Sequence, residues 1–170
     1  MPDADPEIVR PGDIVPEAWA NGLGITRVLV NRPAWRLSLA DIDDEVEFSV
    51  FEGVDRMLMP LSAGGVVLEV EGIRRVVHRG GAASFRGEDR VIARVSEPVR
   101  VMNLMVPRAA VTAEVRIAVD PAADAVVVLV GDAILDGEPL APGTAVLGAA
   151  VHRLDGGADT VVASLRIHVG

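Results

Sequence analysis

Residues 35–41 have the sequence Trp35-Arg36-Leu37-Ser38-Leu39-Ala40-Asp41. Successive side chains of a β-strand point to opposite faces, so this alternation predicts a strand with two different faces. The odd-numbered face is mostly large and apolar, whereas Arg36, Ser38 and Ala40 share the other face. A face of that composition is either plain exterior or the wall of a polar pocket.

Short apolar stretches of this kind recur along the whole chain, separated by glycine, proline, aspartate and asparagine. Glu71-Gly72 ends one such stretch and opens the next, which predicts a hairpin over 66–77. Many short strands with frequent turn signals are typical of an all-β sandwich or barrel. The candidate strands are 26–31, 35–41, 56–61, 66–71, 91–95, 99–106, 114–119, 125–130, 144–151 and 160–169.

The stretch 99–106 is apolar on both of its alternating faces, which predicts a strand buried on both sides. Asn103 is then an amide in apolar surroundings and must find hydrogen-bond partners there. Two interpretations remain open at this point. Asn103 either pins a neighbouring loop or contacts a ligand.

The chain has 170 residues, and a joint is expected at 107–113, where a long strand ends at Pro107. We therefore expect two packed halves, residues 7–108 and 109–170. The second half is short of strands and should borrow one from the N-terminal segment. Thirteen of the 16 arginines precede residue 111, so a site for an anion is expected in the first half.

The composition excludes several kinds of chemistry. The formal net charge is −9, and the chain has no cysteine, tyrosine or lysine. Thiol nucleophiles, thiolate metal sites, lysine Schiff bases and a P-loop lysine are therefore ruled out. The acidic balance disfavours nucleic acid, and no apolar run approaches the roughly 20 residues of a membrane-spanning helix. The acidic, proline-containing N-terminus does not resemble a signal peptide, so we expect a soluble cytoplasmic protein.

Metal and cofactor sites are not expected. The three histidines, His78, His152 and His168, show no metal-ligand spacing, although His152 and His168 lie on neighbouring predicted strands and can meet in space. No Gly-x-Ser-x-Gly motif is present, and the Gly22-Leu23-Gly24 segment is most simply a turn.

Several motifs follow one another in a distinctive order. They are Trp19-Ala20-Asn21-Gly22 with Thr26, the stretch 35–40, Phe48-Ser49-x-Phe51-x-Gly53-Val54-Asp55-Arg56, Phe85-x-Gly87-Glu88 and Asn103-Leu104-Met105. As a set, over residues 8–110, they resemble the HutD/Ves family of small bicupin proteins. Two positions depart from the family pattern, with Leu23 where glycine is usual and Glu47 where proline is usual.

The resemblance implies an all-β bicupin without metal-binding histidines and without an established enzymatic activity. It implies binding of a small carboxylate intermediate of histidine breakdown, such as urocanate or formylglutamate, and modulation of that pathway. Carried over to this sequence, the candidate ligand-binding residues are Asn21, Thr26, Arg36, Ser38, Ser49, Arg56 and Asn103. A guanidinium matches the two oxygens of a carboxylate, and hydroxyl and amide groups can complete the contacts.

Three alternatives stay open. Arg56 can instead pair with Asp55, Asp41 or another acid and lock a corner of the barrel. The protein can be a metal-free cupin isomerase or hydrolase, which needs a titratable group such as Asp41, Asp55, Glu69 or a histidine in its pocket. It can also be a structural module whose apolar sheet faces form a homodimer.

Overall fold

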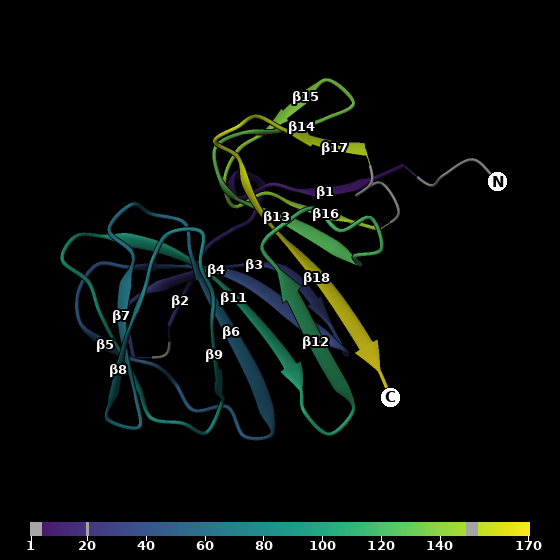
Figure 1. Cartoon of the computed structure of the whole chain (residues 1–170). Coiled ribbons are helices and arrows are strands. Elements are labelled where there is room, and N and C mark those ends of the chain that lie inside the picture. The colour runs from purple at the N-terminus through teal and green to yellow at the C-terminus, as the bar shows by residue number, and fades with distance from the viewer. Residues whose placement is uncertain (1–4, 20, 149–152) are drawn as a thin grey trace.

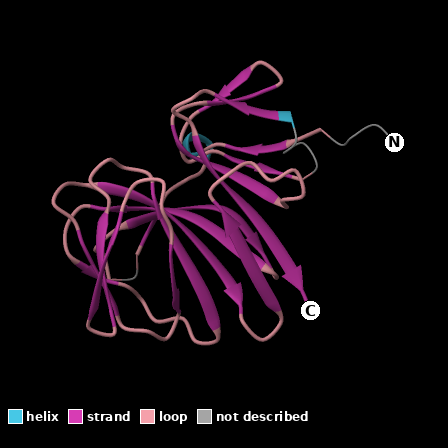
Figure 2. Cartoon of the chain, in the orientation of Figure 1, coloured by secondary structure: helices cyan, strands magenta, loops and turns pink. Residues whose placement is uncertain are grey.

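The computed structural model describes residues 5–19, 21–148 and 153–170, and its regular secondary structure consists almost entirely of antiparallel strands (Figure 2). A 3-10 turn at Pro11–Asp13 follows the first strand. No helix in the described part of the chain is long and apolar enough to cross a membrane. The all-β fold predicted from the alternation is confirmed.

Two sheets form what we call the N-terminal barrel (Figure 1). The first contains, in spatial order, β2 (Glu17–Ala18), β3 (Ile25–Arg32), β4 (Trp35–Ile42), β11 (Val99–Pro107), β6 (Val54–Pro60) and β9 (Ala83–Arg86). The second contains β5 (Val46–Glu47), β10 (Val91–Arg94), β7 (Val66–Val70) and β8 (Ile73–Val77). The predicted hairpin is the β7–β8 pair. Apolar side chains of both sheets, among them Ile42, Leu58 and Leu68, form the core between them.

Two further sheets form the C-terminal sandwich. The larger contains β1 (Glu7–Val9), β16 (Ala145–Leu147), β13 (Ala125–Val130), β18 (Val161–Val169) and β12 (Val111–Arg116). The smaller contains β15 (Glu138–Leu140), β14 (Ala133–Leu135) and β17 (Leu154–Gly156). Strand β1 pairs with β16, so the C-terminal sandwich does borrow a strand from the N-terminal segment, as predicted. The predicted strand 144–151 is described only as far as Gly148 and ends at Leu147.

The central strands β4 and β11 of the six-stranded sheet are buried on both of their faces. Leu37, Leu39 and Leu104 point into a core shared with Val127 and Leu165 of the five-stranded sheet. Because side chains alternate, the other face of β4 and β11 points into the N-terminal barrel. The two-sided burial predicted for β11 is confirmed, since six of the eight residues from Val99 to Val106 are buried. Met102, Leu104 and Val106 lie in the shared core, and Val99 and Val101 lie in the core of the N-terminal barrel. This shared core positions the strands that carry the candidate site.

Candidate functional site

A cavity of about 230 Å³ opens inside the N-terminal barrel, and we call it the inner chamber. Strands β3, β4, β6 and β11 contribute to its walls, together with the loop that follows β5. Six of the seven candidate residues predicted from the sequence line it: Thr26, Arg36, Ser38, Ser49, Arg56 and Asn103. The volume is below the roughly 300–1,000 Å³ typical of sites for drug-sized ligands. The chamber therefore suits a small metabolite.

Strand register brings these residues together. In the six-stranded sheet, Met105 of β11 lies opposite Arg36 of β4 on one side and opposite Arg56 of β6 on the other. Two residues earlier, Asn103 lies opposite Ser38. Residues that are direct cross-strand partners point to the same face of a sheet. The Arg36, Ser38 and Ala40 face is thus the wall of a polar chamber, and the alternative of a plain exterior is wrong.

Arg56 is the most unusual residue of the chamber. Its side chain is only 5% exposed, and its guanidinium carbon lies 5.1–5.4 Å from the ring centroids of Phe48, Phe51 and Phe85. Its Nη1 donates a hydrogen bond of 3.2 Å to the carbonyl oxygen of Ser49, whereas its buried Nε has no partner in the part of the chain that the structure describes. Burial, and secondly the positive charge of Arg36, lower the pKa of Arg56 to about 10. The guanidinium is therefore still charged at neutral pH.

No carboxylate neutralises this charge within the described residues. Asp55 pairs with Arg108 at 2.6 Å, and Asp41 pairs with Arg27 and Arg100. The alternative in which Arg56 pairs with one of these acids is therefore wrong. Although partial burial of Asp41 acts to raise its pKa, hydrogen bonds from Arg100 and Arg27 hold that pKa below its usual range.

Arg36 adds a second positive charge to the chamber. Among its described neighbours, the polar contact of its guanidinium is with the sulfur of Met105, at 4.0 Å from Nη1. A protein of net charge −9 thus places two arginines without carboxylate partners around one small cavity. Because ionic attraction is stronger where water is partly excluded, this arrangement favours an anionic ligand.

Polar groups complete the chamber walls. Thr26 accepts a hydrogen bond of 2.6 Å from the indole nitrogen of Trp19, which fixes the threonine hydroxyl at the wall. Asn103 is 5% exposed, and its Oδ1 has no hydrogen-bond partner in the described structure. An unpaired buried carbonyl oxygen is costly and can accept a hydrogen bond from a bound molecule. Of the two interpretations of Asn103, the geometry favours ligand contact over pinning a loop.

Replacing Asn103 by leucine should stabilise the empty protein. The change removes an unsatisfied buried polar group of similar size, so we expect the free energy of unfolding to rise by about 1–3 kcal/mol. Chemical denaturation measures this difference. The matched change Asn31→Leu, at an exposed position of β3, should alter stability by less than about 0.5 kcal/mol. If Asn103→Leu destabilises the protein, Asn103 has a structural role instead.

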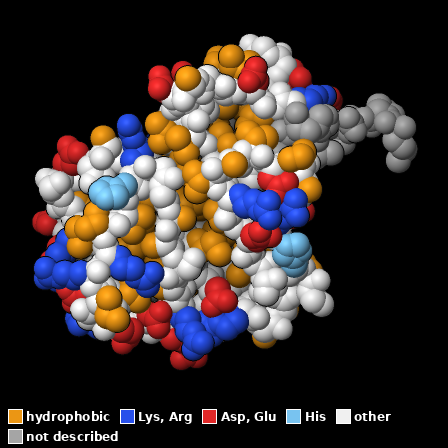
Figure 3. All heavy atoms as spheres, viewed as in Figure 1, with side chains coloured by type: hydrophobic (Ala, Val, Ile, Leu, Met, Phe, Trp, Pro, Cys, Tyr) orange, Lys and Arg blue, Asp and Glu red, His pale blue; other side chains and the backbone are white. Residues whose placement is uncertain are grey.

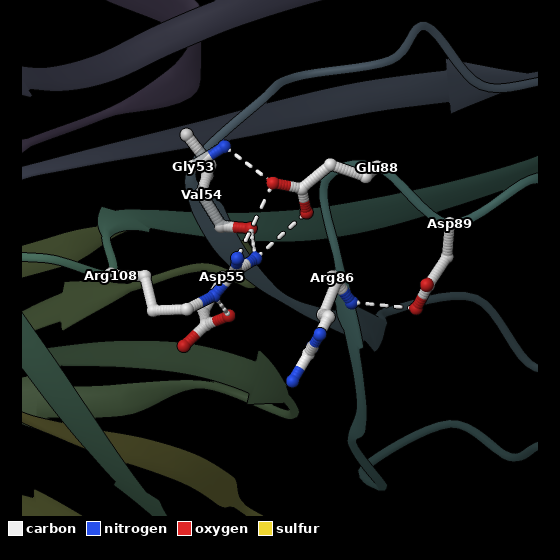
Figure 4. A network of polar contacts seen from close by, with 7 residues as sticks. All are labelled: Gly53, Val54, Asp55, Arg86, Glu88, Asp89 and Arg108. Carbon is white, nitrogen blue, oxygen red and sulfur yellow. Dashed lines mark hydrogen bonds and ion pairs between the residues drawn. The ribbon is translucent and has the colours of Figure 1, made fainter.

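The loop 48–53, which forms one wall of the chamber, is held by the turn between β9 and β10 (Figure 4). Phe51 N donates to the carbonyl oxygen of Gly87, and the Glu88 carboxylate accepts from Gly53 N at 2.5 Å. Arg108 binds both Glu88 and Asp55. Hydrogen bonds from Arg108 and from Gly53 N lower the pKa of Glu88 from 4.5 to about 2. The network is therefore complete above pH 4.5 and is lost only as the pH falls towards 2.

Glu88→Gln should loosen this loop without unfolding the protein. The substitution keeps an acceptor for Gly53 N but removes the ion pair with Arg108, and exposed ion pairs contribute little to the free energy of unfolding. Amide exchange at Phe51 and Gly53 should accelerate by roughly two- to five-fold. Glu114→Gln, which breaks the exposed pair with Arg116 in β12, should leave both amides unchanged. Equal exchange rates in the two variants would contradict this role of Glu88.

The seventh candidate residue, Asn21, does not line the chamber. It is exposed, and its Oδ1 accepts a hydrogen bond of 3.0 Å from Leu23 N within a turn. Leu23 is also exposed and borders a separate depression. Glu47 lies in β5 and pairs with Arg90. Neither departure from the family pattern contacts the inner chamber, although Glu47 directly precedes Phe48, which does line it.

The aromatic part of the site was not predicted from the sequence. All three phenylalanines of the chain surround Arg56, and Trp19 and Met105 line the same cavity. The rings of Phe48 and Phe85 lie 6.4 Å apart, and Trp19 meets Phe48 edge-on at 6.2 Å. The chain has few aromatic residues, and all three phenylalanines lie in the motifs quoted above. This concentration could have predicted an aromatic wall in the candidate site.

Other groups proposed for chemistry lie outside the chamber. Asp41, Asp55 and Glu69 all pair with arginines, and none of them lines the inner chamber. Among the described lining residues, the carboxylate is that of Glu17. No group of three or more potential metal ligands occurs in the described part of the chain. The histidine side chains visible in Figure 3 lie far apart in that view, and His152 lies outside the described residues.

Two β-barrel-like halves around a shared core, with a polar chamber in one of them, define a bicupin. The family model described as HutD matches residues 12–135, and the chain belongs to the HutD family.

Comparison with known proteins agrees with this membership. The chain is 37% identical over 109 residues to "Protein Ves" of Citrobacter koseri, an alignment that covers 59% of this chain and 57% of the relative. It is 31% identical over 108 residues to an "uncharacterized 21.2 kDa protein in hutC 3'region" of Pseudomonas putida, covering 58% and 57%. The chain thus matches less than two thirds of the length of these curated relatives.

Solved structures show the same fold over the whole chain. HutD from Pseudomonas fluorescens SBW25 superposes with a TM-score of 0.76 at 23% identity, covering 97% of this chain and 99% of that protein. A cupin 2 conserved barrel domain protein from Leptotrichia buccalis superposes with a TM-score of 0.57 at 14% identity, covering 100% and 98%. At these identities the likeness concerns the fold alone.

Proposed function

We propose that this protein is a non-enzymatic binding protein that takes a small carboxylate metabolite into the inner chamber and thereby modulates histidine utilisation. The single observation that carries the binding proposal is the buried Arg56, which has neither a carboxylate partner nor a partner for its Nε among the described residues. A carboxylate placed there supplies both a counter-charge and a hydrogen-bond acceptor. Burial of such a charge without compensation is unfavourable, so a bound anion stabilises the folded state.

The physiological part of the proposal rests on family membership and on genomic position in a relative. The chain belongs to the HutD family, and the Pseudomonas putida relative is named for its place beside hutC. Intermediates between histidine and glutamate carry carboxylates, which suit a chamber that contains Arg36 and Arg56. Binding without catalysis is supported by the positions of Asp41, Asp55 and Glu69, which pair with arginines away from the chamber, whose described lining contains Glu17 as a carboxylate.

A thermal-shift screen tests the proposal. The panel contains histidine, urocanate, formiminoglutamate, formylglutamate and glutamate, with divalent metals as a separate arm. A ligand at 100 times its Kd should add about 2.7 kcal/mol of stability, or several degrees in a chain of this size. Arg36→Ala should reduce the shift caused by the active acid, whereas Arg116→Ala, an exposed change in β12, should not.

Three outcomes would contradict the proposal. A shift with a metal alone would indicate a metalloprotein, and turnover of a panel compound would indicate an enzyme. A lack of any shift, together with a stable homodimer, would favour the interaction-module alternative.

A further inference from the structure

Two strands of the N-terminal barrel have a free edge on its outer surface. Strand β8 is the last strand of the four-stranded sheet, and β9 is the last strand of the six-stranded sheet (Figure 1). A groove of about 570 Å³, which we call the docking groove, is lined by residues of both strands, including Arg75 of β8 and Ser84 and Arg86 of β9. Arg75 Nη2 donates a hydrogen bond of 3.5 Å to the carbonyl oxygen of Ser84. Because a side chain connects the two edges, the gap is wider than the roughly 4.8 Å between paired strands.

The backbone of β8 is unpaired along this edge. Glu71 and Gly72 join β7 to β8, and their φ angles of 48° and 79° are those of a two-residue I′ turn. In such a hairpin, Ile73 forms a hydrogen-bonded pair with β7, and every second residue after it does the same. The N–H and C=O groups of Arg74 and Val76 therefore point away from β7, and they have no backbone partner among the described residues. An extended segment can add a strand to groups of this kind.

The side chains along this edge are apolar or positively charged. Ile73 and Val76 are 68% and 61% exposed. The guanidinium groups of Arg75, Arg79 and Arg86 have no carboxylate partner in the part of the chain that the structure describes. A protein of net charge −9 thus presents three arginines without acidic partners beside one free strand edge.

The carboxylates of the docking groove already have other partners. Asp55 pairs with Arg108 at 2.6 Å, and Asp89 accepts a hydrogen bond of 2.9 Å from the backbone nitrogen of Arg86. In the described structure, neither forms an ion pair with the guanidinium of Arg75 or Arg86. The groove therefore complements a partner that brings its own carboxylates.

We propose that β8 and the docking groove bind an extended acidic segment of another protein, which adds a strand to the free edge of β8. Backbone hydrogen bonds to Arg74 and Val76 hold the segment in place. Carboxylates on one face of the added strand pair with Arg75 and Arg86, and apolar side chains on its other face cover Val76. The inference is independent of the proposed function, because it requires no ligand in the inner chamber.

A second copy of this chain fits the edge poorly. Pairing β8 with β8 would bring Arg74 and Arg75 of one copy close to the same arginines of the other. Like charges that lie opposite each other in paired strands are destabilising, whereas opposite charges are favourable. The charge of the edge therefore favours an acidic partner over self-association.

Fluorescence anisotropy with labelled, end-capped six-residue peptides tests the inference on the whole chain. A peptide of alternating valine and glutamate should bind saturably. Replacing its glutamates by glutamine should weaken binding by at least about ten-fold, because each exposed charge pair contributes a factor of roughly 1.5 to 5. Placing proline at a central position of the peptide should also weaken binding, because proline has no backbone N–H to donate.

Two changes in the protein then locate the bound peptide. Proline is tolerated where a backbone N–H faces away from the sheet, so Val76→Pro should keep the fold but weaken peptide binding by about two- to ten-fold. Val76→Thr keeps the N–H and should bind normally, and the melting temperatures of both variants check their folding. Arg75→Gln should weaken binding by about two- to five-fold. Arg116→Gln, on the edge strand β12, should have no effect.

Several results would overturn the inference. The acidic peptide does not bind, or the glutamine peptide binds as tightly as the glutamate peptide. Affinity is the same in Val76→Pro and Val76→Thr and is unchanged in Arg75→Gln. An oligonucleotide binds the same edge more tightly than the peptide does, which would indicate a general polyanion surface. Finally, a homodimer that Val76→Pro dissociates would assign the edge to a second copy of the chain.

Discussion

Replacing Arg56 by methionine should abolish carboxylate binding and, at the same time, stabilise the empty protein. Removing one partner of a buried charged pair costs about 2–5 kcal/mol of binding free energy, which corresponds to roughly 30-fold or more in Kd. Methionine is apolar and flexible enough to pack among Phe48, Phe51 and Phe85. Calorimetry with the active acid from the screen measures the loss of affinity.

The gain in stability follows from the absence of a counter-charge. Replacing buried ionic groups by well-packed apolar residues can stabilise a protein by about 1–4 kcal/mol, and Arg56 carries a buried charge that no described carboxylate offsets. The melting temperature of the variant should therefore rise. Arg116→Met, an exposed substitution, should leave both affinity and stability nearly unchanged. A variant that binds the acid normally, or that unfolds more readily than the parent, would contradict the role assigned to Arg56.

Gly87→Ala should destabilise the protein and weaken ligand binding together. A Cβ at this position would lie 2.0 Å from the carbonyl oxygen of Phe51, a backbone atom that cannot move away without displacing the loop 48–53. The same loop is tied to Gly87 by the hydrogen bond from Phe51 N. We expect a loss of about 1–3 kcal/mol, which lowers the melting temperature by roughly 2–4 °C per kcal/mol.

Gly12→Ala is the control for this change. A Cβ at Gly12 meets no atom within 4 Å, so the substitution should be nearly neutral. Thermal denaturation of the two variants, followed by titration with the active acid, provides the comparison. If Gly87→Ala is as stable as Gly12→Ala, the loop 48–53 is not held as closely against the β9–β10 turn as the structure indicates.

Much of the fold could be predicted from the sequence because the long strands show a clear alternation of apolar and polar residues. Alternation over 35–41 separates the face that packs in the shared core from the face that lines the inner chamber. Most of the strands that were missed, including β2, β5 and β14, have only two or three residues, and β9 has four. Such strands are defined by the partners with which they pair, and a short segment has no periodicity of its own to detect.

The sequence predicted most of the residues of the candidate site but not how they are arranged. Six of the seven residues carried over from the family motifs do line one cavity. Asn21 lies outside it, because a short polar side chain after a strand can bond its own turn as readily as a ligand. Which acids pair with which arginines depends on cross-strand register, so the sequence left the partner of Arg56 open. Only in the folded protein does Arg108 occupy Asp55 and leave Arg56 without a carboxylate.

The most direct test of an anion site at Arg56 is the NMR signal of its own side chain. In a ¹⁵N-labelled sample, the Arg56 Nε–H resonance can be assigned by its disappearance in Arg56→Met and followed while the acid identified in the screen is added. If a carboxylate binds there, this buried donor gains a partner, so its resonance should shift in a saturable manner and its exchange with water should slow. Saturable binding that leaves the Arg56 signal unchanged while exposed arginine signals shift would contradict the account.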